Sequence, residues 1–445
     1  MNKMVYMLLW YLLLPLVFHN ILLKAQTLPK IISGPMQGHT TDSEILIWIL
    51  TQHAETVGIS LHQQKDSEAV AQQTLASDTS KVRFGYFPAQ FHFKHLTANT
   101  TYWYRLFLNR KEVKTGQIRT LKPPGTSDFS FVAGSCALLP ETALEDVQPG
   151  VTAKTYLSAA KTGADFMIWL GDNLYFRNGD WKSYESMFAR YVKMRSLPPL
   201  NFLLESMPQY AIWDDHDFGY DNANSSIPSK DWALQLFKLF WANPAYGHPN
   251  HPGVFFSFEY QDAEFFLLDD RYYKRLQNNQ GDDGTLLGSY QWDWLKQKLL
   301  QSKATFKFVV CGVQMLIENS PAEGLKEFPA ERTAFLDLLQ QNDIKGVILI
   351  SGDRHFSELY RLPRPESYDL YEVTTSPLSS LTTGILLSTS KGTQLAVPKT
   401  RLKRANFAKF TISGTAGNRR CTVFICNKHG KPVWEKTWNL SDLGY

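Results

Sequence analysis

The sequence predicts a layered α/β (α+β) fold in which an N-terminal β-sandwich domain precedes a larger β-sheet sandwich flanked by helices. Two patterns predict it. Residues 27–122 show short alternating apolar and polar runs without helical periodicity, whereas beyond residue 128 short apolar runs alternate with stretches of three-to-four periodicity. The chain has 445 residues, 44% hydrophobic and 13% aromatic, which is enough for two or three domains with a large core.

The first 25 residues predict a secretory signal peptide. Lys3 precedes a largely apolar stretch over residues 4–18, and a second short apolar segment leads to Ala25. About 15 apolar residues are fewer than the 18 or more of a spanning helix, and no second candidate span follows. We therefore expect an exported protein, periplasmic or extracellular, with no stable membrane span after cleavage. An uncleaved anchor is the alternative.

The charge balance argues against a nucleic-acid partner. The chain has 46 Lys and Arg against 42 Asp and Glu, and removing residues 1–25 takes away Lys3 and Lys24, which leaves 44 against 42. A nearly neutral mature protein lacks the broad positive field that attracts nucleic acid. The basic run at residues 399–404 is either a local anion contact or a solvated turn.

The four cysteines do not predict a disulfide framework, although export would permit one. Cys136 and Cys311 each lie within an apolar strand pattern. Cys421 and Cys426 are five positions apart on one predicted strand, so that they point to opposite faces.

Residues 27–122 predict a small sandwich of the immunoglobulin or fibronectin type. Polar turns separate its alternating runs, which cover residues 44–50, 91–96 and 102–108. Residues 121–127 (LKPPGTS) predict a linker, so the second domain begins near Asp128 and extends to residue 445.

Six short apolar runs in the second domain end on charged or metal-binding residue types. Runs of this length bounded by Gly or Asp are typical of fully buried strands, although a single one could belong to a buried helix. The runs cover residues 129–136 (FSFVAGSC), 166–175 (FMIWLGDNLY), 210–217 (YAIWDDHD), 265–273 (FFLLDDRYY), 306–314 (FKFVVCGVQ) and 347–358 (VILISGDRHFSE). In sheets of this kind ligands gather outside the carboxyl ends of the strands, so we expect these endings to converge.

Helical periodicity predicts helices between the runs, over residues 151–161, 181–195, 230–241, 289–300 and 330–342. Residues 407–443 return to a strand-like pattern with a turn at residues 428–431. We expect this final segment to pack on the edge of the core or near the linker.

Asp172 and Tyr175 in GDNLY form the first candidate metal-binding motif. An aspartate can bridge two cations with its two oxygens, and a tyrosine three residues on can offer a phenolate to a strong Lewis acid such as ferric iron. A turn aspartate beside a packed tyrosine is the alternative.

Four consecutive ionisable residues, Asp214 to Asp217, follow AIW. Burial without partners would cost several kcal/mol, and like charges would raise one another's pKa values, a problem that a bound cation removes. His216 among these carboxylates is a candidate proton donor to a leaving oxygen. A surface acidic turn after an edge strand is the alternative.

Asp353 and His355 in SGDRH lie two positions apart, so an extended backbone would point both the same way, and imidazole suits iron or zinc. A helix cap at this strand end is the alternative.

Cys136 in GSC is either a small buried hydrophobe or a thiolate ligand. Arg271 and Arg354 are candidate phosphate clamps, because guanidinium matches two phosphate oxygens, or else structural ion-pair partners.

Other reaction classes have no local support. The sequence contains no GxSxG elbow, no GxxxxGK[ST] loop and no GxGxxG after a strand. Acyl transfer, nucleotide hydrolysis and dinucleotide chemistry are therefore not expected, and metal-assisted hydrolysis remains.

The ordered motifs GSC, GDNLY, WDDHD, DDRYY and SGDRHFSE resemble the PhoD-like alkaline phosphatase and phosphodiesterase family of the calcineurin-like metallophosphoesterases. The segment ISGPMQGHTTD near the N-terminus and LLGSYQWDWL at residues 286–295 also resemble that family, so that the likeness covers about residues 30–440. The resemblance implies a ferric ion and a calcium or other divalent ion. The ferric ligands would be Cys136, Asp172, Tyr175 and His355, and the second ion would bind Asp172, Asp215 and Asp353.

Asp215 and Asp353 stand where the wider superfamily has asparagine and histidine, and such oxygen ligands favour calcium, magnesium or manganese over zinc. The resemblance implies hydrolysis of phosphomonoesters or phosphodiesters by a metal-activated hydroxide, with small-molecule or lipid phosphoesters as substrates. Two other classes stay open: a phospholipase D-like diesterase, for which residues 181–241 should present a wide apolar mouth, and a non-catalytic binding protein stabilised by its metals. Oligomeric state and the order of ester preference are also left open.

Overall fold

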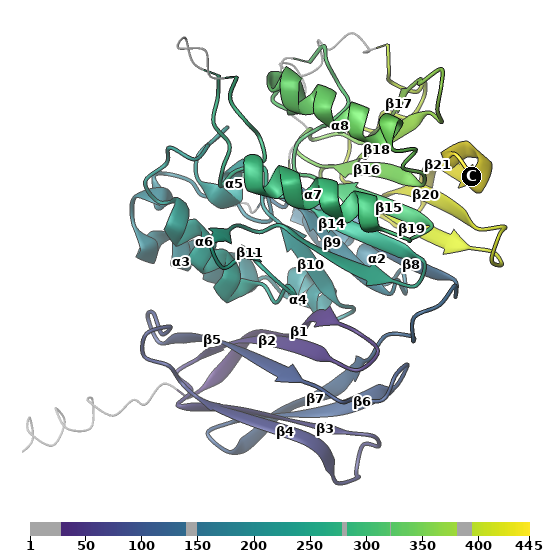
Figure 1. The fold of residues 1–445 in the computed structure, drawn as a ribbon. Helices are drawn as coiled ribbons and strands as arrows, with labels where there is room; N and C mark the ends of the chain where they lie inside the picture. The colour runs from purple at the N-terminus through teal and green to yellow at the C-terminus, as the bar shows by residue number, and fades with distance from the viewer. Residues whose placement is uncertain (1–27, 139–148, 278–282, 321, 381–393) are drawn as a thin grey trace, which may run out of the picture.

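A computed structural model of the chain describes residues 28–138, 149–277, 283–320, 322–380 and 394–445 (Figure 1). The predicted signal peptide lies outside these residues. Among the described residues, no helix is both long and apolar enough to cross a membrane.

The N-terminal strands form two antiparallel sheets, one of three strands in the order β1-β2-β5 and one of four in the order β4-β3-β6-β7. Alternate side chains point into the space between the sheets, as the burial of every second residue in β6 shows. This arrangement matches the predicted β-sandwich. The strands are β1 (Lys30–Thr40), β2 (Ile45–Gln52), β3 (Thr56–His62), β4 (Ala69–Ala76), β5 (Tyr86–Phe93), β6 (Thr101–Leu108) and β7 (Lys111–Arg119).

The following residues form two six-stranded mixed sheets, which stack as the two layers of an α/β core. The first sheet has the order β10-β9-β8-β19-β20-β21 and the second has the order β13-β14-β15-β16-β18-β17. The first contains β8 (Phe129–Gly134), β9 (Phe166–Leu170), β10 (Gln209–Ile212), β19 (Asn406–Ser413), β20 (Arg420–Asn427) and β21 (Pro432–Asn439). The second contains β13 (Phe256–Tyr260), β14 (Ala263–Leu267), β15 (Phe306–Val310), β16 (Val347–Ser351), β17 (Glu358–Leu362) and β18 (Leu370–Thr374); β11 (Gly247–His248) and β12 (His251–Pro252) form a separate ribbon.

Phenylalanine rings fill the space between these two sheets. Phe131 of β8 stacks on Phe410 of β19, with centroids 4.6 Å apart, and meets Phe265 and Phe308 of the other sheet edge-on at 5.1 Å. Edge-to-face and offset contacts are favourable for such rings. The predicted buried strands are therefore confirmed as the walls of a shared core.

Helices cover the outer faces of both sheets, as predicted from the periodicity. Leu295 and Leu299 of α7 and Phe335 and Leu339 of α8 share a core with the outer face of the second sheet. The predicted helix over residues 181–195 is split, because the Ser183 side chain accepts the N–H of Ser186 and starts a new helix there. The helices are α2 (Pro149–Ala160), α3 (Tyr184–Arg195), α4 (Pro198–Leu204), α5 (Asp215–Phe218), α6 (Lys230–Phe240), α7 (Ser289–Gln301) and α8 (Pro329–Gln341), with short 3₁₀ turns η1 (Asp180–Lys182), η2 (Leu325–Glu327) and η3 (Leu440–Leu443). The sequence did not predict α4.

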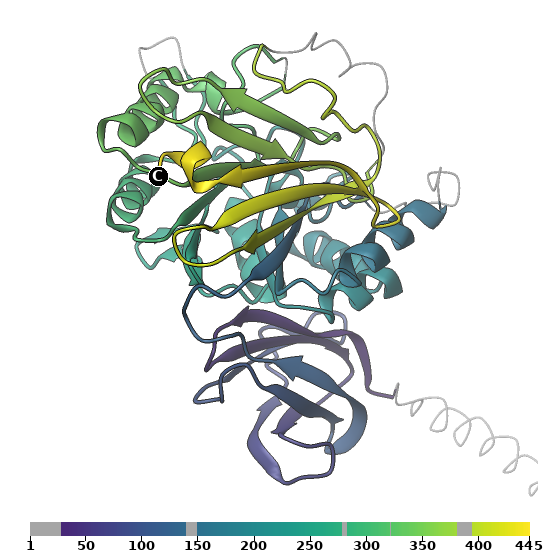
Figure 2. The ribbon, with the colours of Figure 1, turned by 90° about the vertical axis from the view of Figure 1, so that its right-hand side faces the viewer.

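The C-terminal strands complete the first sheet. Strand β19 pairs antiparallel with β8 from Ala408↔Ala133 to Ile412↔Phe129, and β20 and β21 follow it outward (Figure 2). The turn between β20 and β21 falls where predicted, at residues 428–431. The final segment thus extends the core sheet itself.

Polar contacts join the N-terminal sandwich to the helices of the core. The Trp48 indole donates to the carbonyl of Leu239 at 2.8 Å, and the buried Arg195 guanidinium lies 5.0 Å from the Trp48 ring and 4.1 Å from the Trp241 ring. A guanidinium between two aromatic faces is stabilised by cation–π attraction. This contact fixes α3 and α6 beside the strands that carry the site.

Candidate active site

The polar endings of the apolar runs meet at one edge of the core. Strands β8, β9 and β10 run parallel in the first sheet, and β14, β15 and β16 run parallel in the second, so each set directs its carboxyl ends the same way. The loops that leave these ends carry all of the residues predicted to form the site. The expected convergence is therefore seen in the structure.

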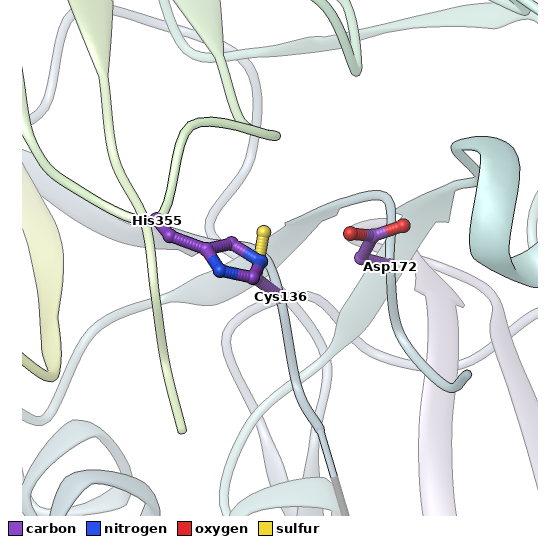
Figure 3. A group of neighbouring side chains, drawn as sticks. All are labelled: Cys136, Asp172 and His355. Atoms are coloured by element: carbon purple, nitrogen blue, oxygen red, sulfur yellow. The ribbon is translucent and has the colours of Figure 1, made fainter. Parts of the chain in front are cut away.

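One group of metal-binding side chains joins the ends of three strands. The Cys136 thiol, an Asp172 carboxylate oxygen and a His355 ring nitrogen lie within 4.8 Å of one another (Figure 3). The Tyr175 hydroxyl donates to Asp172 Oδ2 at 2.8 Å, lies 3.1 Å from His355 Nε2 and accepts a hydrogen bond from Ser380 at 3.1 Å. The structure thus brings together the four residues predicted to bind ferric iron.

A second group shares Asp172 with the first. Ligand atoms of Asp172, Asp215 and His216 also lie within 4.8 Å of one another. Because Asp172 belongs to both groups, its two carboxylate oxygens are placed to bridge two neighbouring cations. Burial opposes ionisation of Asp215, but the charges of His216 and Arg271 hold its pKa at about 2.

Asp353 lies close to this centre but outside the three-residue groups. Its side chain is 24% exposed, and its Oδ2 atom, itself buried, has no hydrogen-bond partner among the described residues. Burial raises the pKa of Asp353 to about 6, and the negative charges of Glu323 and Asp215 act in the same direction. An unpartnered buried oxygen that faces other carboxylates is suited to a cation.

A third group places Arg271 in a role other than the predicted phosphate clamp. Ligand atoms of Asp214, Asp215 and Glu323 lie within 4.8 Å of one another, but Arg271 pairs with both Asp214 and Glu323, and Lys274 also pairs with Glu323. The Arg271 side chain is 0% exposed and its remaining guanidinium nitrogen donates to the carbonyl of Ala223. This placement contradicts substrate contact and corresponds to the structural ion pair, the alternative.

Arg354 is also buried, but its guanidinium is incompletely satisfied. Its Nε atom has no hydrogen-bond partner among the described residues, and its Nη1 lies 3.8 Å from Asp353 Oδ2. The guanidinium also lies 5.4 Å from the Phe356 ring centroid. Arg354 therefore places positive charge beside Asp353.

His216 forms the solvent side of the centre. Its ring lies 4.3 Å from the Tyr175 ring centroid, its side chain is 23% exposed, and its Nε2 is 3.8 Å from Asp221 Oδ1. The imidazole is thus adjacent to the carboxylates and accessible to a ligand. A proton donor to a leaving group needs both properties.

Four of the candidate ligands have an unusual backbone conformation. Cys136, Asp172, Asp353 and His355 have positive φ angles of 59°, 52°, 62° and 53°, which non-glycine residues rarely adopt. Such conformations cost about 1–3 kcal/mol each and persist where the surroundings enforce them. Here the N–H of Ala137 donates to the carbonyl of Asp172 at 2.8 Å, so the loops after β8 and β9 hold each other.

Close packing explains the glycine of SGDRH. A Cβ atom on Gly352 would lie 2.7 Å from Ser135 Oγ and 3.0 Å from the carbonyl oxygen of Leu170. Only glycine lets the loop after β16 approach the loops after β8 and β9. This approach brings His355 to Cys136.

The electrostatics of the first group favour a bound cation. Burial raises the pKa of Asp172 well above its usual value, with the charges of Cys136 and Asp215 acting in the same direction, and burial raises the pKa of Cys136 to about 11. Among the described residues, no Lys or Arg pairs with Asp172. Thiol, phenol, imidazole and carboxylate donors around this unpaired position fit a Lewis-acidic metal, and the carboxylates of the second group fit a harder ion.

Sequence reasoning missed Glu323, and it placed Asp217 in the ionisable cluster without its hydrogen-bonding role. Glu323 lies in an irregular segment 13 positions after β15 ends, far from any apolar run. Asp217 is the last residue of WDDHD, and its carboxylate accepts the N–H groups of Asn173 and Asp214. The capping spacing from Asp214 to Asp217 was visible in the sequence, whereas Glu323 gave no local signal.

The chain belongs to the PhoD-like phosphatase family, whose profile matches residues 131–423. Alkaline phosphatase D of Bacillus subtilis (strain 168) is 25% identical over 326 residues, which are 61% of this chain and 54% of that protein. The chain thus matches about half the length of this curated relative.

Two solved structures share the fold. The structure of PhoD matches with a TM-score of 0.72 at 17% identity, over 91% of each chain. A purple acid phosphatase from yellow lupin (Lupinus luteus) seeds matches with a TM-score of 0.63 at 12% identity, over 91% of this chain and 73% of that one.

Proposed function

We propose that this protein is an exported, metal-dependent phosphoester hydrolase, similar to alkaline phosphatase D, that cleaves phosphomonoesters, phosphodiesters or both. The observation that carries the proposal is the position of Asp172, which belongs to two adjacent groups of metal-binding side chains. One group offers sulfur, nitrogen and phenol donors, and the other offers mainly carboxylates. The apolar leader over residues 4–18 supports export to the periplasm or the cell exterior.

Cys136, Asp172, Tyr175 and His355 would hold ferric iron, and Asp172, Asp215 and Asp353 would hold calcium, with magnesium, manganese or zinc as other occupants of the second position. When bound, the two cations supply Lewis acidity beside the phosphoryl group. Backbone hydrogen bonds between the loops after β8 and β9 hold Cys136 and Asp172 in place. These two donors therefore lie close together before any ligand binds.

The protein side chains around the centre contribute positioning and proton transfer. His216, partly exposed and in tilted ring contact with Tyr175, donates a proton or hydrogen bond to the leaving oxygen. Arg354 offsets negative charge beside Asp353. The neutral form of the leaving alcohol then departs toward the solvent side on which His216 lies.

The direct test is turnover of an aryl phosphate monoester and of the matching diester by the mature protein, loaded with iron and calcium and again after chelation. Activity lost on chelation supports the proposal, and the faster ester assigns monoesterase or diesterase. A loaded protein that hydrolyses neither ester contradicts the proposal and favours a non-catalytic binding protein.

Metal content gives an independent test of the first group. Cys136→Ser is expected to lose or exchange iron while it keeps the second metal, because Cys136 contributes only to the first group. Unchanged iron content in this variant would exclude Cys136 as a ligand.

A further inference from the structure

The solvent side of the site carries a pair of aromatic rings that the groups described above do not use. Trp181 of η1 and Tyr220, two residues after α5, meet edge to face with ring centroids 5.7 Å apart and an interplanar angle of 65°. Tyr220 is 41% exposed, whereas Trp181 packs partly against the main core. Pockets that bind small molecules are lined mainly by hydrophobic and aromatic side chains.

Short connections tie Tyr220 to the second group. The next residue, Asp221, has its Oδ1 3.8 Å from His216 Nε2. The residue after that, Asn222, donates its backbone N–H to Asp215 Oδ2 at 2.6 Å. The turn that presents the Tyr220 ring is therefore anchored on both Asp215 and His216.

Trp181 is tied to the site through the loop that follows β9. Phe176, the residue after Tyr175, donates its N–H to the carbonyl of His216 at 3.1 Å. Asp180 then accepts hydrogen bonds from the N–H of Arg177 at 3.0 Å and from Arg190 Nε at 2.7 Å, which fixes η1 on α3. The two loops thus run side by side from the candidate ligands to the ring pair.

The burial of the site residues sets the direction in which a leaving alcohol extends. Cys136, Asp172 and Asp215 are 0%, 2% and 5% exposed, so the protein closes the site on their side. The His216 side chain is 23% exposed and that of Asp221 is 78% exposed. A leaving group that is protonated by His216 therefore extends toward solvent on the side of Asp221, the residue that follows Tyr220 in the chain.

We propose that Trp181 and Tyr220 form a leaving-group subsite that favours phosphoesters of aromatic or other flat apolar alcohols. The inference rests on the proposed function and extends it to substrate class. A ring that lies on this pair gains contact area and aromatic attraction that a short alkyl group does not. The rings contact the substituent equally before and during bond cleavage, so they act on KM more than on kcat.

The test compares 2-naphthyl and ethyl phosphoesters, in the ester class that the wild-type metal-loaded enzyme hydrolyses. In Tyr220→Ala the ratio of kcat/KM values, naphthyl over ethyl, is expected to fall about 3- to 10-fold, the size of one aromatic contact. The loss should appear in KM, and Tyr220→Phe, which keeps the ring, should restore the ratio. Binding of 2-naphthylmethylphosphonate, which is not hydrolysed, should weaken by the same factor in Tyr220→Ala.

Trp232 provides the matched control, since its ring is also 41% exposed but lies on α6, outside the pair. Trp232→Ala should keep the wild-type ratio, and Trp181→Phe, which keeps a ring against the core, should lower it less than Tyr220→Ala. An unchanged ratio and unchanged phosphonate binding in Tyr220→Ala, with an active wild type, would overturn the subsite alone. A wild-type protein that hydrolyses neither ester overturns the proposed function and the subsite with it.

Discussion

The buried carboxylates next to Asp215 differ in how their charge is neutralised: Asp214 and Glu323 have a partner in the protein, and, within the described part of the chain, Asp172 does not. Asp214 and Glu323 are paired with Arg271, whose side chain is fully buried. Neighbouring carboxylates raise the pKa of Arg271 well above its usual value, although burial opposes this, so the guanidinium stays charged. Asp172, on the other side, has no such partner among the described residues, and burial raises its pKa. Asp214 and Glu323 are thus neutralised by cations of the protein itself and stabilise the fold, whereas Asp172 is placed to bind cations from solution.

The largest effect is expected from Asp172→Asn. Asparagine keeps the shape but cannot bridge two cations, so turnover should fall to the uncatalysed rate and both metals should be lost. The metal-free variant should unfold at higher urea concentration than metal-free wild type, because a carboxylate whose ionisation is disfavoured by burial is gone. Activity assays, metal analysis and urea titration measure the three effects. Full activity in this variant would show that Asp172 does not bind the catalytic cations and so does not differ from Asp214 and Glu323 in this way.

Arg271→Met tests the other side of the comparison. It leaves Asp214 and Glu323 buried without their guanidinium, which typically costs about 3–5 kcal/mol of unfolding free energy, with or without metal. Arg361→Met is the control, because Arg361 pairs with Asp369 at the surface, where such pairs contribute about 1 kcal/mol or less. Lost activity at unchanged stability in Arg271→Met would instead restore the phosphate clamp.

The pH dependence of the metal-free protein gives the next effect. The pKa of Asp353 is raised from 3.8 to about 6, so in this range the folded state binds more protons than the unfolded state. Its contribution to stability is therefore present at low pH and is lost as the pH rises through about 6. The full loss amounts to roughly 3 kcal/mol for this shift, and most of it falls between pH 4 and pH 8.

Asp353→Asn separates this contribution from those of other titrating groups. The variant lacks the carboxyl, so its stability relative to wild type should increase by up to about 3 kcal/mol from pH 4 to pH 8. Urea unfolding of chelated proteins at a series of pH values measures the difference. Addition of calcium should remove or reverse it, and a pH-independent difference without metal would show that Asp353 is not destabilised by its surroundings.

The sequence predicted the candidate metal ligands around Asp172 better than the ion pairs around Arg271, for a physical reason. Cys136, Asp172 and His355 follow buried strands by a few residues, so an apolar run and a parallel sheet suffice to bring them together. From the sequence, Arg271 could be either a phosphate clamp or an ion-pair partner. Its role depends on the position of Glu323, with which it pairs. The irregular segment that carries Glu323 has no periodicity in the sequence. Only the folded structure shows that this segment brings Glu323 to Arg271.

Asp217 represents a third way to satisfy a buried carboxylate, and it carries the smallest predicted effect. It is 0% exposed and accepts the Asn173 N–H at 3.0 and 3.2 Å through its two oxygens, and the Asp214 N–H at 3.1 Å. It therefore joins the loop after β9 to the start of α5. Through this contact it supports the positive φ of 52° at Asp172.

Asp217→Asn leaves one acceptor oxygen for these N–H groups, so Asp172 should lose alignment with both neighbouring groups without losing its carboxylate. Supporting contacts of this kind are worth about 10–100-fold in metal affinity or activity. We expect a weaker apparent affinity for calcium and recovery of most of kcat at saturating calcium, which ligand loss in Asp172→Asn cannot show. Asp231→Asn, an exposed carboxylate that accepts only from the Tyr272 hydroxyl in the described structure, is the control. A kcat that stays low at every calcium concentration would place Asp217 among the groups that act on the substrate, because its effect would then not pass through the alignment of Asp172.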